Sequence, residues 1–193
     1  MRHDGFSLIE LAVVLGIAAA STAIAVPQVL ATIDDSRALA AARYLSTRLQ
    51  QTRTEAVLRT KNVALRVTQA GASYSYTVYQ DGNGDGVLAR DIQRGVDTVV
   101  HPAEALSSLF SGVDFGALPG LPAADSGGSA PGSDPVKLGS GNMVSFTATG
   151  TSSTGSLYIL GRRGAQYALV VYGETGRTRL SKWDALNHQW RPL

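Results

Sequence analysis

Residues 5–30 read Gly-Phe-Ser-Leu-Ile-Glu-Leu-Ala-Val-Val-Leu-Gly-Ile-Ala-Ala-Ala-Ser-Thr-Ala-Ile-Ala-Val-Pro-Gln-Val-Leu, and Glu10 is their only charged side chain. About twenty apolar residues in a helix are enough to cross the ~30 Å hydrocarbon core of a bilayer. The stretch therefore predicts one membrane-spanning helix over residues 6–30. A carboxylate at that depth costs about 2.5 to 3.5 kcal/mol on insertion scales, so Glu10 needs a partner or a function.

The motif Gly-Phe-Ser-Leu-Ile-Glu at residues 5–10 resembles the processing site of type IV prepilins and type II secretion pseudopilins. The resemblance implies that residues 1–5 are a leader peptide. It implies that a prepilin peptidase cuts between Gly5 and Phe6 and methylates the new N-terminal Phe6. In that family the acid at the position of Glu10 pairs with the N-terminal amine of a neighbouring subunit. The alternative is an ordinary single-pass anchor in which Glu10 has no such role.

The same resemblance implies where the chain works and with what. Pro27 falls where such pilins usually have a helix-kinking proline, and a proline there bends a helix because it removes one backbone donor. We expect a single pass through the inner membrane, with residues 31–193 as a globular domain in the periplasm. The implied partners are other pilin or pseudopilin subunits, the prepilin peptidase and the inner membrane itself.

Composition limits what the remaining chain can be. Of 193 residues, roughly 160 remain after the anchor, which fits one domain. The formal charge of +2 is too small to indicate nucleic-acid binding by itself. The chain has no cysteine, which excludes disulfides and thiolate metal sites. Its three histidines stand in no metal-binding or nucleophile motif, so we expect neither an enzyme nor a resident cofactor.

Periodicity predicts an α+β fold in which the N-terminal helix continues into the domain. From residue 28 to about 61, small and apolar residues recur every three or four positions and should face the domain. This predicted stripe comprises Ala38, Ala41, Ala42, Leu45, Leu49, Thr52 and Ala56. Alternating residues then predict a hairpin at 63–67 and 74–78, followed by strands at 96–100, 143–147, 156–160, 166–172, 177–183 and 189–192. We expect these strands to form an antiparallel sheet packed on the helix.

Residues 111–142 are dominated by Gly, Ser, Pro and Asp. Such a composition buries too little apolar area to offset the entropy of ordering. We therefore expect a flexible surface loop inserted between the early hairpin and the late strands.

The layout of a long helix, an early hairpin, a variable loop and late antiparallel strands resembles the group of minor pseudopilins that contains GspH and the fimbrial protein FimT. The segment Thr-Gly-Arg-Thr-Arg at residues 175–179 is similar to a Gly-Arg-x-Arg pattern of that group. The resemblance implies a minor pseudopilin of a type II secretion system or a type IV pilus that supports filament assembly and protein secretion. The sequence does not choose between secretion system and pilus.

Two alternative functions share the same anchor. In FimT-like minor pilins the Gly-Arg-x-Arg pattern is associated with DNA capture for transformation. Here the pattern gives Gly176, Arg177 and Arg179, with Lys182 as a further cation expected nearby. Phosphate binding by such a patch would weaken steeply with salt. The plainer interpretation is a glycine turn whose exposed strand carries arginines for solubility or subunit contacts. The other alternative is an anchored periplasmic binding or sensory domain.

The acidic stretch Asp-Gly-Asn-Gly-Asp-Gly at residues 81–86 resembles the start of an EF-hand loop. The resemblance stops there, because an EF-hand requires a bidentate Glu at position twelve and the chain has Ile92 there. A looser Ca²⁺ site would use four residues: Asp81, Asn83, Asp85 and Asp91. The other interpretation is a glycine-rich turn between strands.

Overall fold

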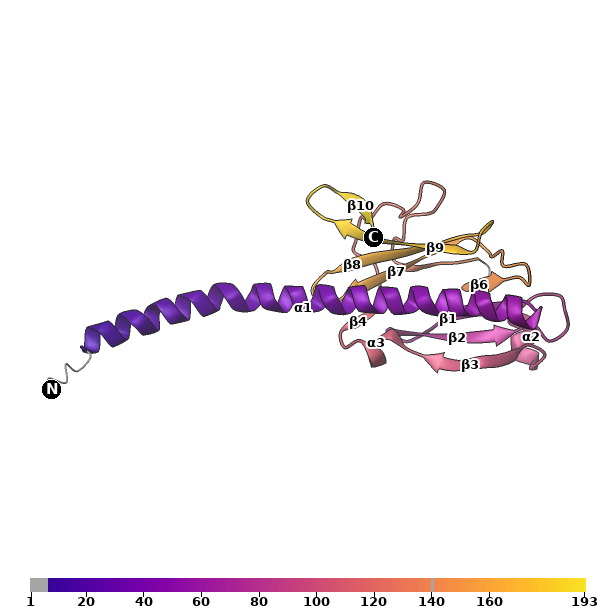
Figure 1. Cartoon of the computed structure of the whole chain (residues 1–193), viewed down its shortest axis with the longest axis horizontal. Coiled ribbons are helices and arrows are strands. Elements are labelled where there is room, and N and C mark those ends of the chain that lie inside the picture. Colours follow the sequence, from indigo (N-terminus) through magenta and orange to yellow (C-terminus); the bar gives the residue numbers. More distant parts are fainter. Residues whose placement is uncertain (1–6, 140) are drawn as a thin grey trace.

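The computed structural model describes residues 7–139 and 141–193. A single long helix, α1 (Leu8–Arg59), leads into a compact β-rich domain (Figure 1). The elements that follow are β1 (Val63–Ala70), β2 (Ser73–Gln80), α2 (Ala89–Arg94), β3 (Thr98–Glu104), α3 (Leu106–Leu109), β4 (Val113–Phe115), β5 (Val136–Lys137), β6 (Met143–Phe146), β7 (Gly155–Gly161), β8 (Gln166–Tyr172), β9 (Arg177–Asp184) and β10 (Gln189–Pro192).

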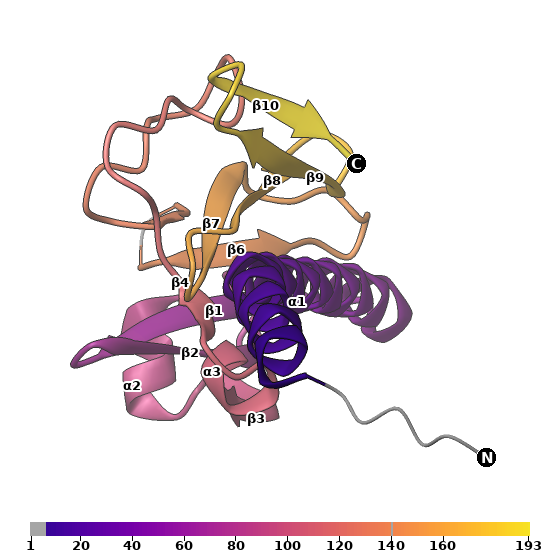
Figure 2. The same cartoon turned by 90° about the vertical axis from the view of Figure 1, so that its left-hand side faces the viewer.

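The strands form two sheets. The first has the order β3-β2-β1-β6, and the second has the order β10-β9-β8-β7-β4, with β5 also paired to β7. Every pairing is antiparallel. Seen along the helix, one sheet lies above the other and α1 runs beside both (Figure 2). The helix thus closes one side of the space between the two sheets.

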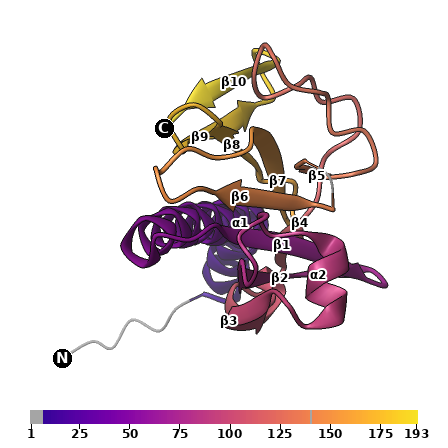
Figure 3. The ribbon, with the colours of Figure 1, turned by 90° about the vertical axis from the view of Figure 1, so that its right-hand side faces the viewer.

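The buried face of α1 is the stripe of small and apolar residues that the sequence predicts. All seven predicted residues are buried, and Asp34 is the one further buried residue of the helix. Helix α1 contacts β1 and β6 of the first sheet, and the three elements lie next to one another in Figure 3. The core gathers Leu45 and Leu49 from α1 with Leu65, Leu157 and Leu169 from both sheets.

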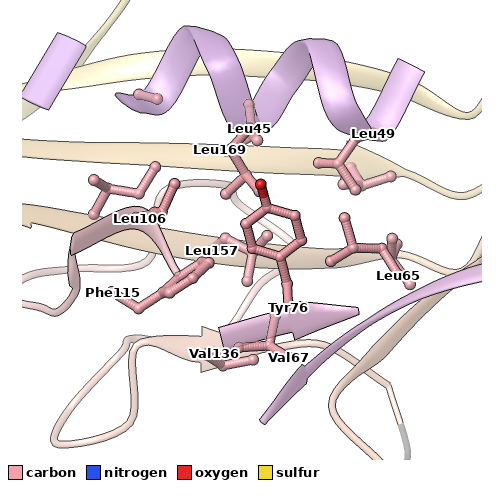
Figure 4. Close-up of a cluster of buried hydrophobic side chains, with 14 of the residues drawn as sticks. Leu45, Leu49, Leu65, Val67, Tyr76, Leu106, Phe115, Val136, Leu157 and Leu169 are labelled. Carbon is pink, nitrogen blue, oxygen red and sulfur yellow. The ribbon is translucent and has the colours of Figure 1, made fainter. Parts of the chain in front are cut away.

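Tyr76 stands at the centre of this core. The residue is only 1% exposed, and its hydroxyl points from β2 toward the helix (Figure 4). That hydroxyl donates to Glu104 at 2.5 Å, so a polar atom inside the core has its partner. The same carboxylate accepts from the hydroxyl of Tyr44 at 2.8 Å, which connects the helix to the first sheet.

The predicted fold class is confirmed. The helix runs past residue 28 as expected, the early hairpin is β1 and β2, and strands β8 and β10 coincide with their predicted ranges. The prediction of one sheet is corrected, because β7 pairs with β8, β4 and β5 and not with the hairpin. The short helices α2 and α3 were not predicted.

The expectation that residues 111–142 bury too little apolar area to pack is corrected for the described part of this segment, and its flexibility stays a prediction. The segment contributes β4 and β5 to the second sheet. It also buries five apolar side chains: Val113, Phe115, Leu121, Ala124 and Val136. Large aromatic residues of the second sheet supply the cover that the segment's own composition lacks: the hydroxyl of Tyr158 accepts from the Ala124 amide at 3.0 Å, and the Trp190 indole donates to the Pro122 carbonyl at 3.1 Å.

Candidate functional site

The first half of α1 extends away from the domain (Figure 1). Its large apolar side chains are exposed, from Leu8 at 86% to Ile24 at 66%. By length and composition alone, α1 is able to cross a membrane, and none of its most apolar stretch is buried. An exposed apolar surface of this extent is typical of a region that contacts a membrane or another protein.

Glu10 lies in the first turn of this exposed half. Its carboxylate accepts from the Ser7 amide at 3.1 Å, which satisfies one of the free amides at the helix start. It is the only ionisable side chain between Leu8 and Ile33. Gly5 and Phe6 lie outside the described residues, so their processing stays a prediction. Helix α1 continues without interruption through Pro27, and its apolar half curves away from the axis of the packed half (Figure 1).

The second half of α1 is fastened to the strands by polar contacts that sequence reasoning missed. Asp35 accepts from the hydroxyl of Tyr167 at 2.9 Å and pairs with Lys182 at 2.7 Å. Arg48 pairs with Glu104 at 2.9 Å. Partial burial raises the pKa of Glu104, but hydrogen bonds from the two tyrosines and the charge of Arg48 lower it by more. These contacts attach the packed half of α1 to both sheets at Asp35 and Arg48.

Strand β9 carries the predicted basic motif, and Arg177 and Arg179 lie on one face of it. Arg177 is exposed. Arg179 is engaged, because its guanidinium donates to Asp125 at 3.1 Å and to the Ala124 carbonyl at 2.9 Å and lies over the Tyr172 ring. One of the two guanidinium groups is thus committed to holding the segment that contains Asp125.

Lys182 does not join these arginines. Successive side chains of a strand point to opposite faces, so position 182 faces away from positions 177 and 179. It faces α1, where it pairs with Asp35. The expectation that Lys182 shares a patch with the two arginines was wrong. The alternation of side chains along the strand could have shown this from the sequence.

Gly176 has a packing role. Its φ is +61°, and a Cβ added there would lie 2.4 Å from the Gly150 carbonyl oxygen. Its own carbonyl accepts from the side-chain Nε2 of Gln50 at 3.3 Å. Glycine at this position lets the turn between β8 and β9 reach α1. Packing is therefore enough to explain a glycine here, and no bound ligand is needed.

In the acidic loop at residues 81–86, hydrogen bonds from the protein occupy the carboxylate oxygens of Asp81. Four donors fill the two oxygens of Asp81: the amides of Asn83, Gly84 and Gly86 and the side chain of Asn62. Burial raises the pKa of Asp81, but these hydrogen bonds lower it by more. Asp85 and Asp91 both pair with Arg90.

These contacts bear on the predicted calcium site. Among the residues that the structure describes, no group of three or more acidic, histidine or cysteine side chains is placed to hold a metal ion. The amides occupy the oxygens that a cation would need at Asp81. The arrangement matches the glycine-rich turn better, and calcium binding by Asp81, Asn83, Asp85 and Asp91 stays an untested prediction.

Comparison with known proteins identifies the family to which this sequence belongs. The sequence matches the family described as type II transport protein GspH over residues 41–176, a range that includes most of the packed half of α1 and most of the β-domain. The chain belongs to the GspH family. Curated protein sequences gave no match.

Two solved structures resemble this GspH-family chain, both of the minor pseudopilin EpsH from the type II secretion system of Vibrio cholerae. One is 16% identical, with a TM-score of 0.46, and covers 75% of this chain and 95% of that chain. The other, a crystal structure, is 13% identical, with a TM-score of 0.40, and covers 82% of this chain and 94% of that chain.

Proposed function

We propose that this GspH-family chain is a minor pseudopilin of a type II secretion system. The precursor inserts α1 into the inner membrane with its domain in the periplasm. A prepilin peptidase cuts between Gly5 and Phe6 and methylates Phe6. The mature subunit then joins other pseudopilin subunits in a short filament that supports protein secretion.

The observation that carries this proposal is the division of α1. Its apolar half is exposed, while its other half is packed inside the domain that matches the GspH family. An exposed apolar helix fixed to a folded domain needs a cover that the monomer does not provide. Lipid is that cover in the precursor, and the α1 helices of neighbouring subunits replace it in the filament.

Glu10 supplies the register of that packing. In a surrounding of low dielectric constant an unpaired carboxylate is costly, and so is an unpaired amine. The cut before Phe6 creates an amine at the helix start, and a neighbouring subunit shifted to the correct level brings its Glu10 beside it. Any other register leaves both charges without partners, so the pair selects one arrangement.

The proposal is tested by replacing Glu10 with glutamine in a host where this chain is the only source of the subunit. We expect secretion to fail and crosslinks between subunits to disappear, while the domain unfolds as in the unaltered protein. The matched control is Glu174→Gln, which removes an exposed acid from the β-domain and should leave secretion intact. Full secretion with Glu10→Gln would instead favour an anchored binding or sensory domain.

DNA uptake by a FimT-like pilin is the competing function. It would place Arg177, Arg179 and Gly176 at a phosphate-binding surface. The engagement of Arg179 by Asp125 weighs against it, and the secretion role is preferred because the matching family is described by transport.

A further inference from the structure

A hollow of 360 Å³ lies where the apolar half of α1 meets the domain. Its lining includes Leu30, Ile33, Asp34 and Arg37 from the helix and Arg162 and Arg163 from the turn between β7 and β8. We call this hollow the membrane-end pocket. It combines an apolar wall with three arginines, and it stands apart from the strand β9 motif described above.

The turn that forms one wall is locked onto the helix. Asp34 is 6% exposed, and its carboxylate accepts from the Arg163 amide at 2.8 Å. A Cβ added to Gly161 would lie 2.6 Å from the same carboxylate, so only glycine lets the strand approach this closely. The positions of Arg162 and Arg163 relative to α1 are therefore set by a buried contact.

The pocket carries a positive charge that the protein does not neutralise. Three arginines against the single acid Asp34 leave a net charge of +2 among the lining residues. Within the described residues, Arg37, Arg162 and Arg163 form no ion pair, although nine other pairs do form. All three are exposed. Guanidinium groups bind phosphate in a two-pronged geometry, so the pocket suits a phosphate anion.

The pocket also lies at the right depth. Asp34 is the first ionisable side chain after Glu10, so the hydrocarbon layer ends near Ile33. At 1.5 Å per residue, the stretch from Leu8 to Ile33 is roughly 38 Å long and spans a ~30 Å layer when tilted. Arg37 then stands about 6 Å further along the helix, within the headgroup layer of roughly 5 to 8 Å.

Other parts of the domain's membrane-facing end agree with this placement. The turn between β9 and β10 and the short helix α3 both lie toward the side from which the apolar half of α1 extends (Figure 1). That turn carries Leu186, which is 93% exposed, and α3 carries Leu109, which is 51% exposed. Neither leucine lines the pocket, and single exposed apolar side chains are common on protein surfaces, so they are compatible with this placement and the pocket itself carries the argument.

We propose that the membrane-end pocket binds the phosphate of an anionic phospholipid headgroup in the leaflet that the domain faces. Arg37, Arg162 and Arg163 hold the phosphate, while Leu30 and Ile33 contact the glycerol and upper acyl chains. The bound lipid fixes how the domain sits on the membrane before the subunit joins a filament. This inference rests on the proposed insertion of α1 into a membrane.

The test uses the full chain in lipid nanodiscs made from equal parts of phosphatidylglycerol and phosphatidylcholine. The lipid that stays bound after gentle release is identified by native mass spectrometry. Each arginine near an anionic surface contributes roughly fivefold, so we expect the protein to retain phosphatidylglycerol at least about tenfold over phosphatidylcholine. The triple variant Arg37→Gln, Arg162→Gln, Arg163→Gln should retain both lipids equally, and Arg37→Gln alone should lose roughly fivefold.

The matched control removes three exposed cations at other sites, Lys61→Gln, Arg94→Gln and Arg177→Gln, and should keep the full preference. A wild-type protein that inserts but shows no lipid preference would overturn the inference. So would a control that loses as much as the triple variant, or displacement of the lipid by millimolar inorganic phosphate alone, which would indicate a simple anion site. Failure to insert into nanodiscs would instead overturn the proposed function, because insertion is scored separately by flotation.

Discussion

The two halves of α1 have the same secondary structure and opposite surroundings. From Leu8 to Ile33 the helix is apolar all round and exposed, whereas from Asp34 to Arg59 it has one buried stripe and a polar remainder. A helix that is apolar all round requires an apolar environment on every side, and a helix with a stripe requires one partner. The difference shows that the helix divides into two regions with different surroundings, and the change of pattern near Asp34 marks the border between them.

The largest loss of stability should come from a substitution in the packed half of α1. Leu45→Ala opens a cavity in the core where α1 meets both sheets, and we expect a loss of about 2 to 5 kcal/mol in the free energy of unfolding. Urea unfolding of the full chain in detergent, followed by tryptophan fluorescence, measures it. The matched variant Leu15→Ala, at a site 60% exposed, should leave the domain's stability unchanged. Equal losses would remove the distinction between the halves.

The second largest loss of stability should follow from a substitution in the turn between β8 and β9, where the turn contacts the packed half of α1. Gly176→Ala places a Cβ against the Gly150 carbonyl at a positive φ, and we expect about 1 to 3 kcal/mol of destabilisation. Gly71→Ala has a similar φ of +64° with nothing within 4 Å, so it reports backbone strain alone. If the two glycine variants unfold at the same urea concentration, the turn does not press on Gly150 of the β6–β7 loop or on the Arg53 side chain of α1.

A smaller effect should follow from the polar link between α1 and the first sheet. Glu104→Gln removes the charge that Arg48, Tyr44 and Tyr76 hold, and we expect a loss of about 1 to 2 kcal/mol. Because the folded state lowers the pKa of Glu104, its contribution is present above the unfolded pKa of about 4.3 and is lost as the pH falls through the lower folded value.

A pair of urea titrations, at neutral pH and at a pH below the unfolded pKa, checks that sign. The difference between wild type and Glu104→Gln should shrink at the acidic pH. Glu174→Gln, on an exposed loop, is the control and should follow wild type at both. A difference that grows on acidification would contradict the assignment.

The smallest effect is expected at strand β9. Replacing Arg177 and Arg179 with alanine should leave DNA retention in gel shifts at the level of wild type, because Arg179 is already bound to Asp125 and Lys182 faces the helix. The double variant should cost about 1 kcal/mol or less of stability through the lost ion pair. Loss of DNA retention with Arg177→Ala and Arg179→Ala, but not with Arg94→Ala, would establish the competing DNA-uptake function.

The two halves of α1 also differ in how much of their structure the sequence could predict. The buried stripe from Ala38 to Ala56 was predictable, because helical spacing fixes which residues share a face. The border at Asp34 was visible only as the end of the apolar run; its contact with the Arg163 amide joins residues 129 positions apart, and no local pattern reports such a pairing.

The wrong expectation for residues 111–142 has the same cause, namely contacts between residues that are far apart in the sequence. The segment around Ala124 is poor in apolar residues, yet it packs because Tyr158 and Trp190 of the second sheet cover it. Local composition cannot show which distant side chains will lie over a segment. Strand alternation, by contrast, is local, and it was sufficient to place Lys182 on the face opposite Arg179.

If the exposed half of α1 is an assembly helix released from a precursor, the intact mass of the mature protein will show the cut between Gly5 and Phe6. The protein is purified from the membranes of a host with an active prepilin peptidase, and from one without it. We expect a mass that corresponds to a chain beginning with N-methylated Phe6 in the first host, and the uncut precursor in the second. A mature chain that begins with unmethylated Met1 in both hosts would contradict processing by the peptidase and leave α1 as an ordinary anchor.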